Sequence, residues 1–234
     1  MTIQDRFAAI DWDRVSADLD GRGWTTSGPL LSAEDREALI AAYKDDRLFR
    51  STVVMARHGF GKGEYRYFSN PLPELIGTLR KALYARLIPV ANQWRERLGQ
   101  GDLLPAEHAE YLELCHAAGQ TRPTPLLLRY GPGDYNCLHQ DLYGDLSFPL
   151  QAAFLLSEPA GFEGGEFVLT EQRPRMQSRV HVVPLKAGEA VIFAVNHRPV
   201  QGAKGTYRVT MRHGVSPVRS GSRHTLGIIL HDAA

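Results

Sequence analysis

The sequence predicts an α+β fold in which a double-stranded β-helix, a barrel of the jelly-roll or cupin-like type, follows a layer of helices. Two observations carry this prediction: helical periodicity before residue 122, and short β-prone runs separated by Gly and Pro after it. A length of 234 residues with 43% hydrophobic and 23% charged residues is ordinary for a globular domain. We therefore expect one domain over 1–234, with mainly helical support in 1–121 and the barrel core in 122–234.

Three segments of the N-terminal half have helical patterns. The segment 32–46 begins with Ser32, a favourable N-cap, and continues with apolar residues at helical spacing. The segment 73–99 carries a leucine every four residues, and Pro89 predicts a kink in this helix or its division into two. A third helix is expected over 105–119, where a glycine ends it.

Seven β-type runs follow, and turn-forming segments such as GPGD, GFEGG and VQGAKG separate them. The runs are 124–130, 150–157, 165–170, 179–185, 189–195, 207–218 and 224–230. Many short strands with this punctuation are typical of a sandwich or barrel.

The amino-acid composition bears on the expected binding partners and on the cellular setting of the protein. With 27 Lys and Arg against 26 Asp and Glu, net charge gives no general argument for nucleic acid, although local basic patches remain informative. Cys115 and Cys137 are too few for a disulfide framework, so we expect both to pack within the fold in a reducing, cytoplasmic setting. The acidic, amphipathic start does not resemble a signal peptide, and no apolar run reaches the roughly 18 residues of a membrane span.

The stretch DYNCLHQDLYG, residues 134–144, places His139 and Asp141 two positions apart. On an extended strand such residues point the same way, so the two side chains can bind one ion, although a polar pair on a sheet rim would look the same. His213 lies in a later β-type run and is the expected third ligand, with His197 as its rival. Two histidines and one carboxylate with open positions are typical of non-haem Fe(II) oxygenases.

Arg223 follows His213 by ten residues, across the turn RSGS. Its planar guanidinium is suited to bidentate capture of a carboxylate. The interval predicts a dicarboxylate cosubstrate that meets the metal at one end and Arg223 at the other. Because no arginine stands ten residues after His197, the interval also favours His213 as the third ligand.

These residues resemble those of Fe(II)/2-oxoglutarate-dependent dioxygenases. RYGPGDYNCLHQD (129–141) is similar to a segment of AlkB-type nucleic-acid demethylases in which a tyrosine, here Tyr130, helps hold 2-oxoglutarate. GGEFVLT, VPLKAGEAVIF and RHGVSPVRSGSR are similar to the barrel of prolyl-hydroxylase-type enzymes. Longer stretches, including ARHGFGKGEYRYF (56–68), resemble a bacterial family of predicted nucleic-acid oxygenases.

The resemblance implies Fe(II) bound by His139, Asp141 and His213, which are also the catalytic residues. It implies 2-oxoglutarate held by Arg223 and Tyr130, with O2 as the oxidant. The activity it implies couples decarboxylation of 2-oxoglutarate to hydroxylation or oxidative demethylation.

Three alternatives for the substrate stay open. They are modified nucleic-acid bases, a protein side chain or small metabolite as in prolyl hydroxylases, and no substrate at all in a non-catalytic ligand-binding barrel. Leu128 stands where AlkB enzymes have asparagine, so that resemblance does not fix the substrate. The sequence indicates no oligomeric state.

Two basic segments are candidate substrate contacts. The first contributes Arg57, His58, Arg66 and Tyr67, as a lid or nucleic-acid contact, although a solvated hairpin would have the same composition. The second contributes Arg173 and Arg175, on a loop expected near the barrel mouth.

Overall fold

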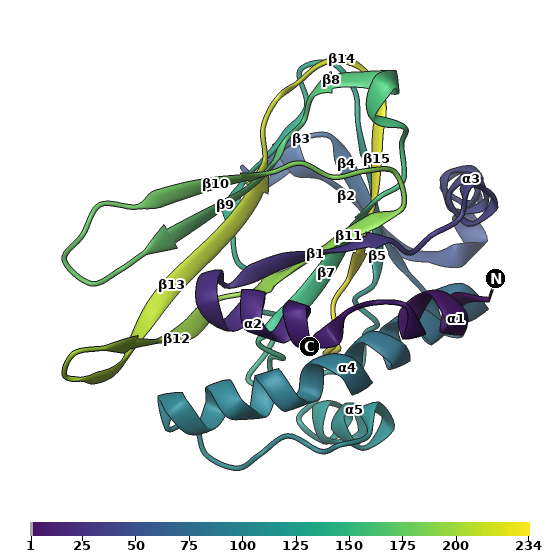
Figure 1. Cartoon of the computed structure of the whole chain (residues 1–234). Helices are drawn as coiled ribbons and strands as arrows, with labels where there is room; N and C mark the ends of the chain where they lie inside the picture. Colours follow the sequence, from purple (N-terminus) through teal and green to yellow (C-terminus); the bar gives the residue numbers. More distant parts are fainter. Residues whose placement is uncertain (1) are drawn as a thin grey trace.

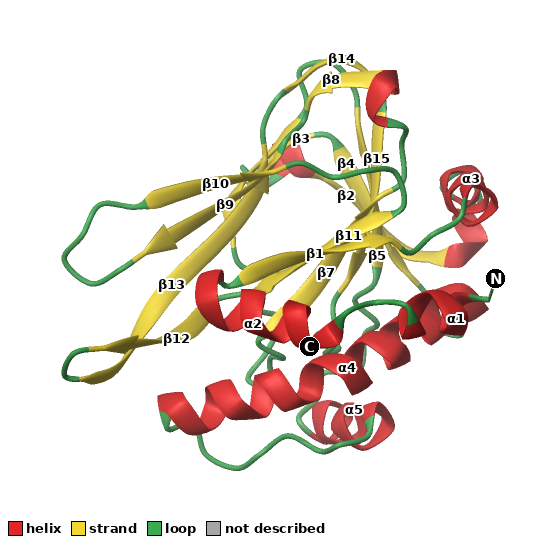
Figure 2. Ribbon diagram, viewed as in Figure 1, coloured by secondary structure: helices red, strands yellow, loops and turns green. Residues whose placement is uncertain are grey.

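Two antiparallel β-sheets form the centre of the fold, and helices gather outside the larger one (Figure 1, Figure 2). The computed structural model describes residues 2–234. The seven-stranded sheet has the order β1-β11-β7-β15-β5-β4-β2. The smaller sheet has the order β10-β9-β13-β6-β3, with β12 also paired to β13, and β14 pairs separately with β8.

The strands of the large sheet are β1 (Trp24–Pro29), β2 (Phe49–Val54), β4 (Glu64–Phe68), β5 (Leu126–Tyr130), β7 (Leu150–Leu155), β11 (Glu189–Ala194) and β15 (Arg223–Ile228). Those of the smaller sheet are β3 (Gly61–Lys62), β6 (Tyr135–His139), β9 (Phe167–Gln172), β10 (Arg179–Val183), β12 (His197–Gly202) and β13 (Gly205–Val215). The short pair is β8 (Phe162–Gly164) and β14 (Val218–Gly221). All seven predicted β-type runs form strands, whereas β6, β8, β12 and β14 were not among them.

The helices are α1 (Ile3–Ala8), α2 (Trp12–Arg22), α3 (Ala33–Ala42), α4 (Glu74–Leu98) and α5 (His108–Ala117). Ser32 caps α3 as predicted, and its hydroxyl accepts a hydrogen bond from the Asp35 amide. The helix α4 continues through Pro89 as one element, so of the two predicted outcomes, a kink or a division into two helices, the division is excluded. Within residues 2–234, no helix combines the length and apolar character needed to cross a membrane.

The leucine stripe of α4 packs against the outer face of the large sheet and forms the main core. Leu79, Leu83 and Leu87 are fully buried in one cluster with Phe154 and Ile192 of the sheet. Side chains alternate along a strand, so the neighbours of these sheet residues point to the other face. There, Gln151 and Ala153 of β7 line a cavity between the two sheets.

The segment 1–121 contains all five α-helices of the described chain, and it also contributes β1, β2, β3 and β4, which the sequence did not predict. β1 pairs with β11 at one edge of the large sheet, and β2 and β4 extend its other edge beyond β5. The inward residues of β1 include Thr25 and Ser27, which are buried but polar. The strand therefore lacks the alternation of apolar and polar residues on which the prediction depended.

Candidate metal and cosubstrate site

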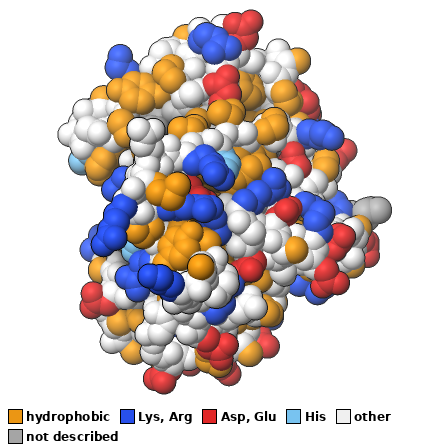
Figure 3. Space-filling view, turned by 60° about the vertical axis from the view of Figure 1, so that its left-hand side comes forward, with side chains coloured by type: hydrophobic (Ala, Val, Ile, Leu, Met, Phe, Trp, Pro, Cys, Tyr) orange, Lys and Arg blue, Asp and Glu red, His pale blue; other side chains and the backbone are white. Residues whose placement is uncertain are grey.

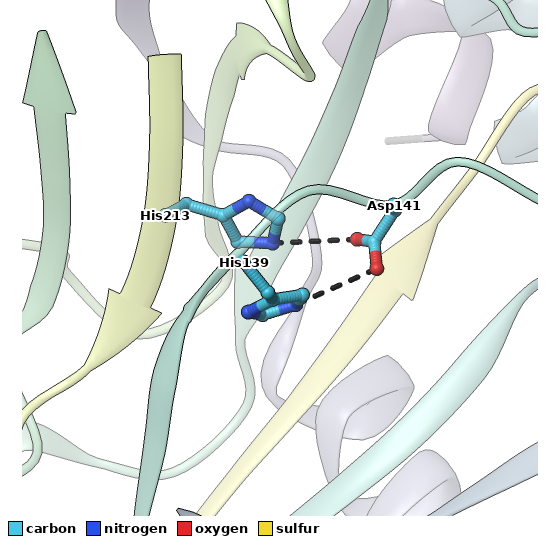
Figure 4. Close-up of side chains that lie close together, drawn as sticks. All are labelled: His139, Asp141 and His213. Atoms are coloured by element: carbon cyan, nitrogen blue, oxygen red, sulfur yellow. Dashed lines mark ion pairs between the residues drawn. The ribbon is translucent and has the colours of Figure 1, made fainter. Parts of the chain in front are cut away.

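His139 and His213 lie directly opposite one another on the antiparallel pair β6–β13, with ring centroids 4.1 Å apart. Asp141 follows two residues after His139, just beyond the end of β6. Its carboxylate oxygens lie 3.4 Å from Nε2 of His139 and 3.3 Å from Nε2 of His213 (Figure 4). The three side chains point toward one another, and their potential ligand atoms all lie within 4.8 Å.

The local backbone fixes how the histidines present their nitrogens. Nδ1 of His139 lies 2.8 Å from the carbonyl oxygen of Cys137, and donation to it leaves the Nε2 lone pair free for a metal. Beside His213, Gly214 allows β13 to approach β6 closely. A Cβ at position 214 would lie 2.7 Å from the carbonyl oxygen of Asn136.

Asp141 is held by two groups that the sequence did not single out. The Tyr143 hydroxyl donates to Oδ1 at 2.7 Å, and the Gln151 amide donates to Oδ2 at 2.7 Å. The Tyr67 hydroxyl donates in turn to the Tyr143 hydroxyl at 3.0 Å. These hydrogen bonds fix the orientation of the carboxylate before any metal arrives.

The groups around Asp141 favour its ionised form beside the two imidazole rings. Burial acts to raise the pKa of Asp141, but the hydrogen bonds and charges of His139 and His213 outweigh it and hold that pKa well below the ordinary value. Burial, followed by the Asp141 charge, raises the pKa of Tyr143 well above its ordinary value. Its hydroxyl therefore keeps the proton that it donates to Asp141.

Arg223 and Tyr130 form a second pair, directly opposite one another on β15–β5 of the other sheet. Both are buried, at 2% and 0% exposed. Within residues 2–234, Nε and Nη1 of Arg223 and the hydroxyl of Tyr130 have no hydrogen-bond partner. A buried arginine without a hydrogen-bonded acidic partner is costly, which indicates that an anion completes this pocket. Burial raises the pKa of Tyr130 to about 12, so its hydroxyl is a donor.

Gly165 makes room for this arginine. A Cβ at Gly165 would lie 2.7 Å from Cδ of Arg223, and the residue has a φ of 63°, which favours glycine.

One cavity of about 310 Å³ connects the two pairs, because its lining includes His139, Asp141 and His213 together with Tyr130 and Arg223. This volume is within the range of small-molecule sites.

Exposed apolar side chains also line the cavity. Phe60 and Leu138 are each 48% exposed. Cys137 is exposed and lines the cavity as well, so the expectation that it packs inside the fold is wrong, whereas Cys115 is buried as expected.

Arg66 and Tyr67 do not line the cavity. Arg66 is paired with Asp46 at 2.6 Å and donates to the carbonyl oxygen of Tyr43 at 2.7 Å. Tyr67 is buried behind Tyr143. The structure therefore assigns Arg66 to the support of the β2–β4 hairpin and Tyr67 to the support of Asp141.

The other predicted residues of this segment are exposed. Arg57 ends the short helix η2 (Met55–Arg57), and the ring of His58 stacks on Phe60 with centroids 5.3 Å apart. The carbonyl oxygen of Phe60 accepts a hydrogen bond from the Cys137 amide at 2.9 Å. This bond ties the segment to the strand that carries His139.

Arg173 and Arg175 lie on the loop between β9 and β10. Arg173 is paired with Glu171 at 2.6 Å, whereas Arg175 is exposed with a φ of 61°. The rival ligand His197 lies outside the metal cluster, beside Thr210 at 3.4 Å.

Solved structures with the same architecture include prolyl hydroxylases and a member of the 2OG-Fe(II) oxygenase family. A prolyl-4-hydroxylase of Pseudomonas putida is 19% identical, with a TM-score of 0.54 over 95% of this chain and 99% of that one. A 2OG-Fe(II) oxygenase family oxidoreductase of Burkholderia pseudomallei is 16% identical, with a TM-score of 0.54 over 96% and 93%. A prolyl hydroxylase of Trichoplax adhaerens is 12% identical, with a TM-score of 0.57 over 97% and 90%. These likenesses confirm the double-stranded β-helix fold.

The sequence comparisons are more specific. The uncharacterized protein Rv2227 of Mycobacterium tuberculosis is 48% identical over 168 residues, which cover 71% of this chain and 72% of that protein. Residues 63–233 match the family Oxygenase-NA, described as "Oxygenase, catalysing oxidative methylation of damaged DNA". The chain belongs to this oxygenase family.

Proposed function

We propose that this oxygenase depends on Fe(II) and 2-oxoglutarate and acts on modified or damaged nucleic-acid bases. The observation that carries the cofactor assignment is the unpartnered, buried guanidinium of Arg223 in the same cavity as His139, Asp141 and His213. Two imidazoles and one carboxylate are the donor set that non-haem Fe(II) oxygenases use. When bound, iron and 2-oxoglutarate supply an oxidation in which O2 converts 2-oxoglutarate to succinate and CO2 and a substrate C–H bond to C–OH.

The protein positions the reactants. Tyr143 and Gln151 hold the Asp141 carboxylate, so that it need not reorient when the metal binds. Arg223 binds the far carboxylate of 2-oxoglutarate as a bidentate partner, and the Tyr130 hydroxyl donates a further hydrogen bond. These contacts orient the 2-oxo acid end toward the metal ligands.

Apolar side chains form part of the cavity wall. Leu126, Leu128, Phe167 and Val215 line it together with the polar site residues. Because Arg223 is 2% exposed, its attraction for a carboxylate is stronger than at the protein surface.

Nucleic-acid bases are the proposed substrate because the family description names damaged DNA and because aromatic side chains lie at the cavity. Phe60 presents an exposed ring there, with His58 stacked on it and Arg57 nearby in the chain. Aromatic rings of this kind stack on bases, and arginines contact phosphates. On an N-methylated base, oxidation gives a hydroxymethyl group that is lost as formaldehyde, which restores the unmodified base.

The second candidate is hydroxylation of a protein side chain, amino acid or small metabolite. The ten-residue interval from His213 to Arg223 and the fold shared with prolyl hydroxylases favour it. A carbon centre would then be hydroxylated without loss of formaldehyde.

The test is succinate release by protein reconstituted with Fe(II) under anaerobic conditions and then supplied with O2 and 2-oxoglutarate. Methylated oligonucleotides, peptides and metabolites are compared as substrates, with His139→Ala and Arg223→Ala as controls. We expect succinate and formaldehyde in equal amounts with methylated oligonucleotides, and no turnover by His139→Ala. Stimulation by peptides or metabolites alone would support the second candidate. The absence of both iron binding and succinate would indicate a non-catalytic barrel.

A further inference from the structure

The outer face of β13 carries a regular row of basic and hydroxyl side chains. The row, which we call the β13 stripe, begins with Lys204 in the turn before the strand and continues at every second strand residue with Thr206, Arg208, Thr210 and Arg212. The intervening residues Val209, Met211 and His213 are buried on the inner face. One strand therefore presents a metal ligand to the cavity and a polar row to solvent.

The two hairpins around the stripe are rich in basic residues, two of which, Arg173 and Arg198, are paired with Glu171. The segments 172–183 and 197–213 contain three and four Lys and Arg residues and no Asp or Glu, although the chain as a whole is nearly neutral. The cross-strand neighbours of the stripe are neutral: Arg212 faces Thr170, Thr210 faces Gln172, and Arg208 faces Pro199. The side of the molecule where these hairpins project shows several Lys and Arg side chains across its centre and left, with some acidic side chains among them and others at the right and bottom (Figure 3).

The stripe is also open to a ligand. Lys204, Arg208 and Arg212 are exposed, and none of the three makes an ion pair within residues 2–234. This contrasts with Arg66, Arg173 and most other arginines of the described chain, which are paired with acidic side chains or backbone carbonyls. Free guanidinium and ammonium groups on an extended, flat face can meet an anionic polymer without first breaking an internal pair.

The spacing suits a repeating anion. At about 3.3 Å per residue, Arg208 and Arg212 are about 13 Å apart along the strand, which is about two phosphate spacings of an extended nucleic-acid strand. A threonine stands between each pair of basic residues. Arg, Lys and Thr side chains are common donors to phosphate oxygens.

We propose that the β13 stripe binds the phosphate backbone of a polynucleotide. The natural substrate is then an oligo- or polynucleotide whose flanking phosphates rest on the stripe, rather than a free nucleoside. This inference rests on the proposed function in taking nucleic acid as the partner, but it concerns a surface that lies outside the cavity.

The first test measures binding without catalysis. A fluorescently labelled single-stranded oligonucleotide is titrated with metal-free protein at several salt concentrations, for wild type, K204Q/R208Q, and the matched control K44Q/K81Q. Lys44 and Lys81 are exposed and lie at the end of α3 and on α4, so the control loses the same charge elsewhere. We expect K204Q/R208Q to bind at least tenfold more weakly, with the slope of log K against log salt reduced by about 1.4 for two lost contacts. The control should retain the wild-type slope.

Equal slopes in both double variants, or no salt-dependent binding by wild type, would overturn the inference. So would equally effective competition by a polyglutamate, because the stripe would then recognise any polyanion.

The second test separates this inference from the proposed function. If methylated oligonucleotides are substrates, K204Q/R208Q should raise their KM at least tenfold while leaving kcat and turnover of a methylated nucleoside unchanged. Oligonucleotide turnover with an unchanged KM would overturn the inference and leave the proposed function intact. Stripe-dependent binding without turnover would support the inference and contradict the proposed substrate.

Discussion

Arg223 and Tyr130 face one another directly across strands β15 and β5, and the guanidinium carbon lies 5.6 Å from the tyrosine ring centroid. His213 and His139 face one another in the same way on the opposing sheet. The ten residues from His213 to Arg223 thus carry the chain from one sheet to the other. Each sheet contributes one cross-strand pair to a shared cavity.

Substitution of Arg223 should weaken binding of 2-oxoglutarate. Arg223→Met removes a charged hydrogen-bond pair worth about 2–5 kcal/mol, which corresponds to a rise in the KM for 2-oxoglutarate of about 30-fold or more. Tyr130→Phe should raise the KM for 2-oxoglutarate by a smaller factor, because a neutral hydrogen bond contributes about 1 kcal/mol. Steady-state kinetics with 2-oxoglutarate as the varied substrate checks both. An unchanged KM in Arg223→Met would place the cosubstrate elsewhere.

The same substitution should not destabilise the protein that lacks cosubstrate. Arg223 is buried without an ion-pair partner in the described chain, so its replacement by an apolar side chain removes a desolvated ion. We expect Arg223→Met to have a melting temperature equal to or above that of wild type in the absence of 2-oxoglutarate. It should also lose the rise in melting temperature that 2-oxoglutarate gives wild type. A marked fall in melting temperature would mean that Arg223 has a structural role.

Tyr143→Phe should weaken metal binding. It removes the donor to Oδ1 of Asp141, and loss of such an outer hydrogen bond typically costs about 10- to 100-fold in metal affinity. Tyr67→Phe should have a smaller effect, because Tyr67 acts through Tyr143. Calorimetric titration with Fe(II) under anaerobic conditions measures both. Tyr111→Phe, on α5, is the matched control because its hydroxyl has no partner in the described chain.

His108 should make the fold sensitive to acid. It is 7% exposed at the start of α5, and burial, with a smaller effect of the Arg80 charge, lowers its pKa to about 4. Between the unfolded pKa of 6.5 and about 4, the unfolded chain binds a proton that the folded chain does not. The free energy of unfolding therefore falls as the pH drops through this window, and the loss is complete below about 4.

The fall in the His108 pKa from 6.5 to about 4 corresponds to roughly 3 kcal/mol of stability. Denaturant unfolding at pH 7.5 and pH 4.5 measures it, with His108→Gln as the comparison. Gln cannot be protonated, so the variant should lose less stability between the two pH values than wild type. An equal loss in both proteins would show that His108 does not contribute.

The iron-binding cluster could be predicted from sequence because each ligand belongs to a short-range spacing pattern, even though the two patterns lie far apart in the chain. His139 and Asp141 share a face through their spacing, and His213 was selected by its interval to Arg223. Tyr143 could have been found in the same way, since it lies two residues after Asp141. Gln151 could not, because it reaches Asp141 from another strand, and only the pairing of strands brings it there.

The substrate residues were harder to predict because composition does not reveal pairing. Arg66 lies in a basic-aromatic segment, yet the register of β4 against β2 places it beside Thr52 and within reach of Asp46. Phe60 lies in the same segment and lines the cavity, but nothing in its spacing distinguished it from its neighbours. The N-terminal strands were missed for a related reason, since β1 buries hydroxyl side chains instead of apolar ones.

The most direct measurement is calorimetric titration of 2-oxoglutarate into the protein under anaerobic conditions, with and without Fe(II). We predict one site per chain whose affinity requires Fe(II), is lost in His213→Ala, and is strongly weakened in Arg223→Met. Binding that does not depend on Fe(II), or that persists unchanged in both variants, would contradict a shared site for metal and cosubstrate between the two sheets.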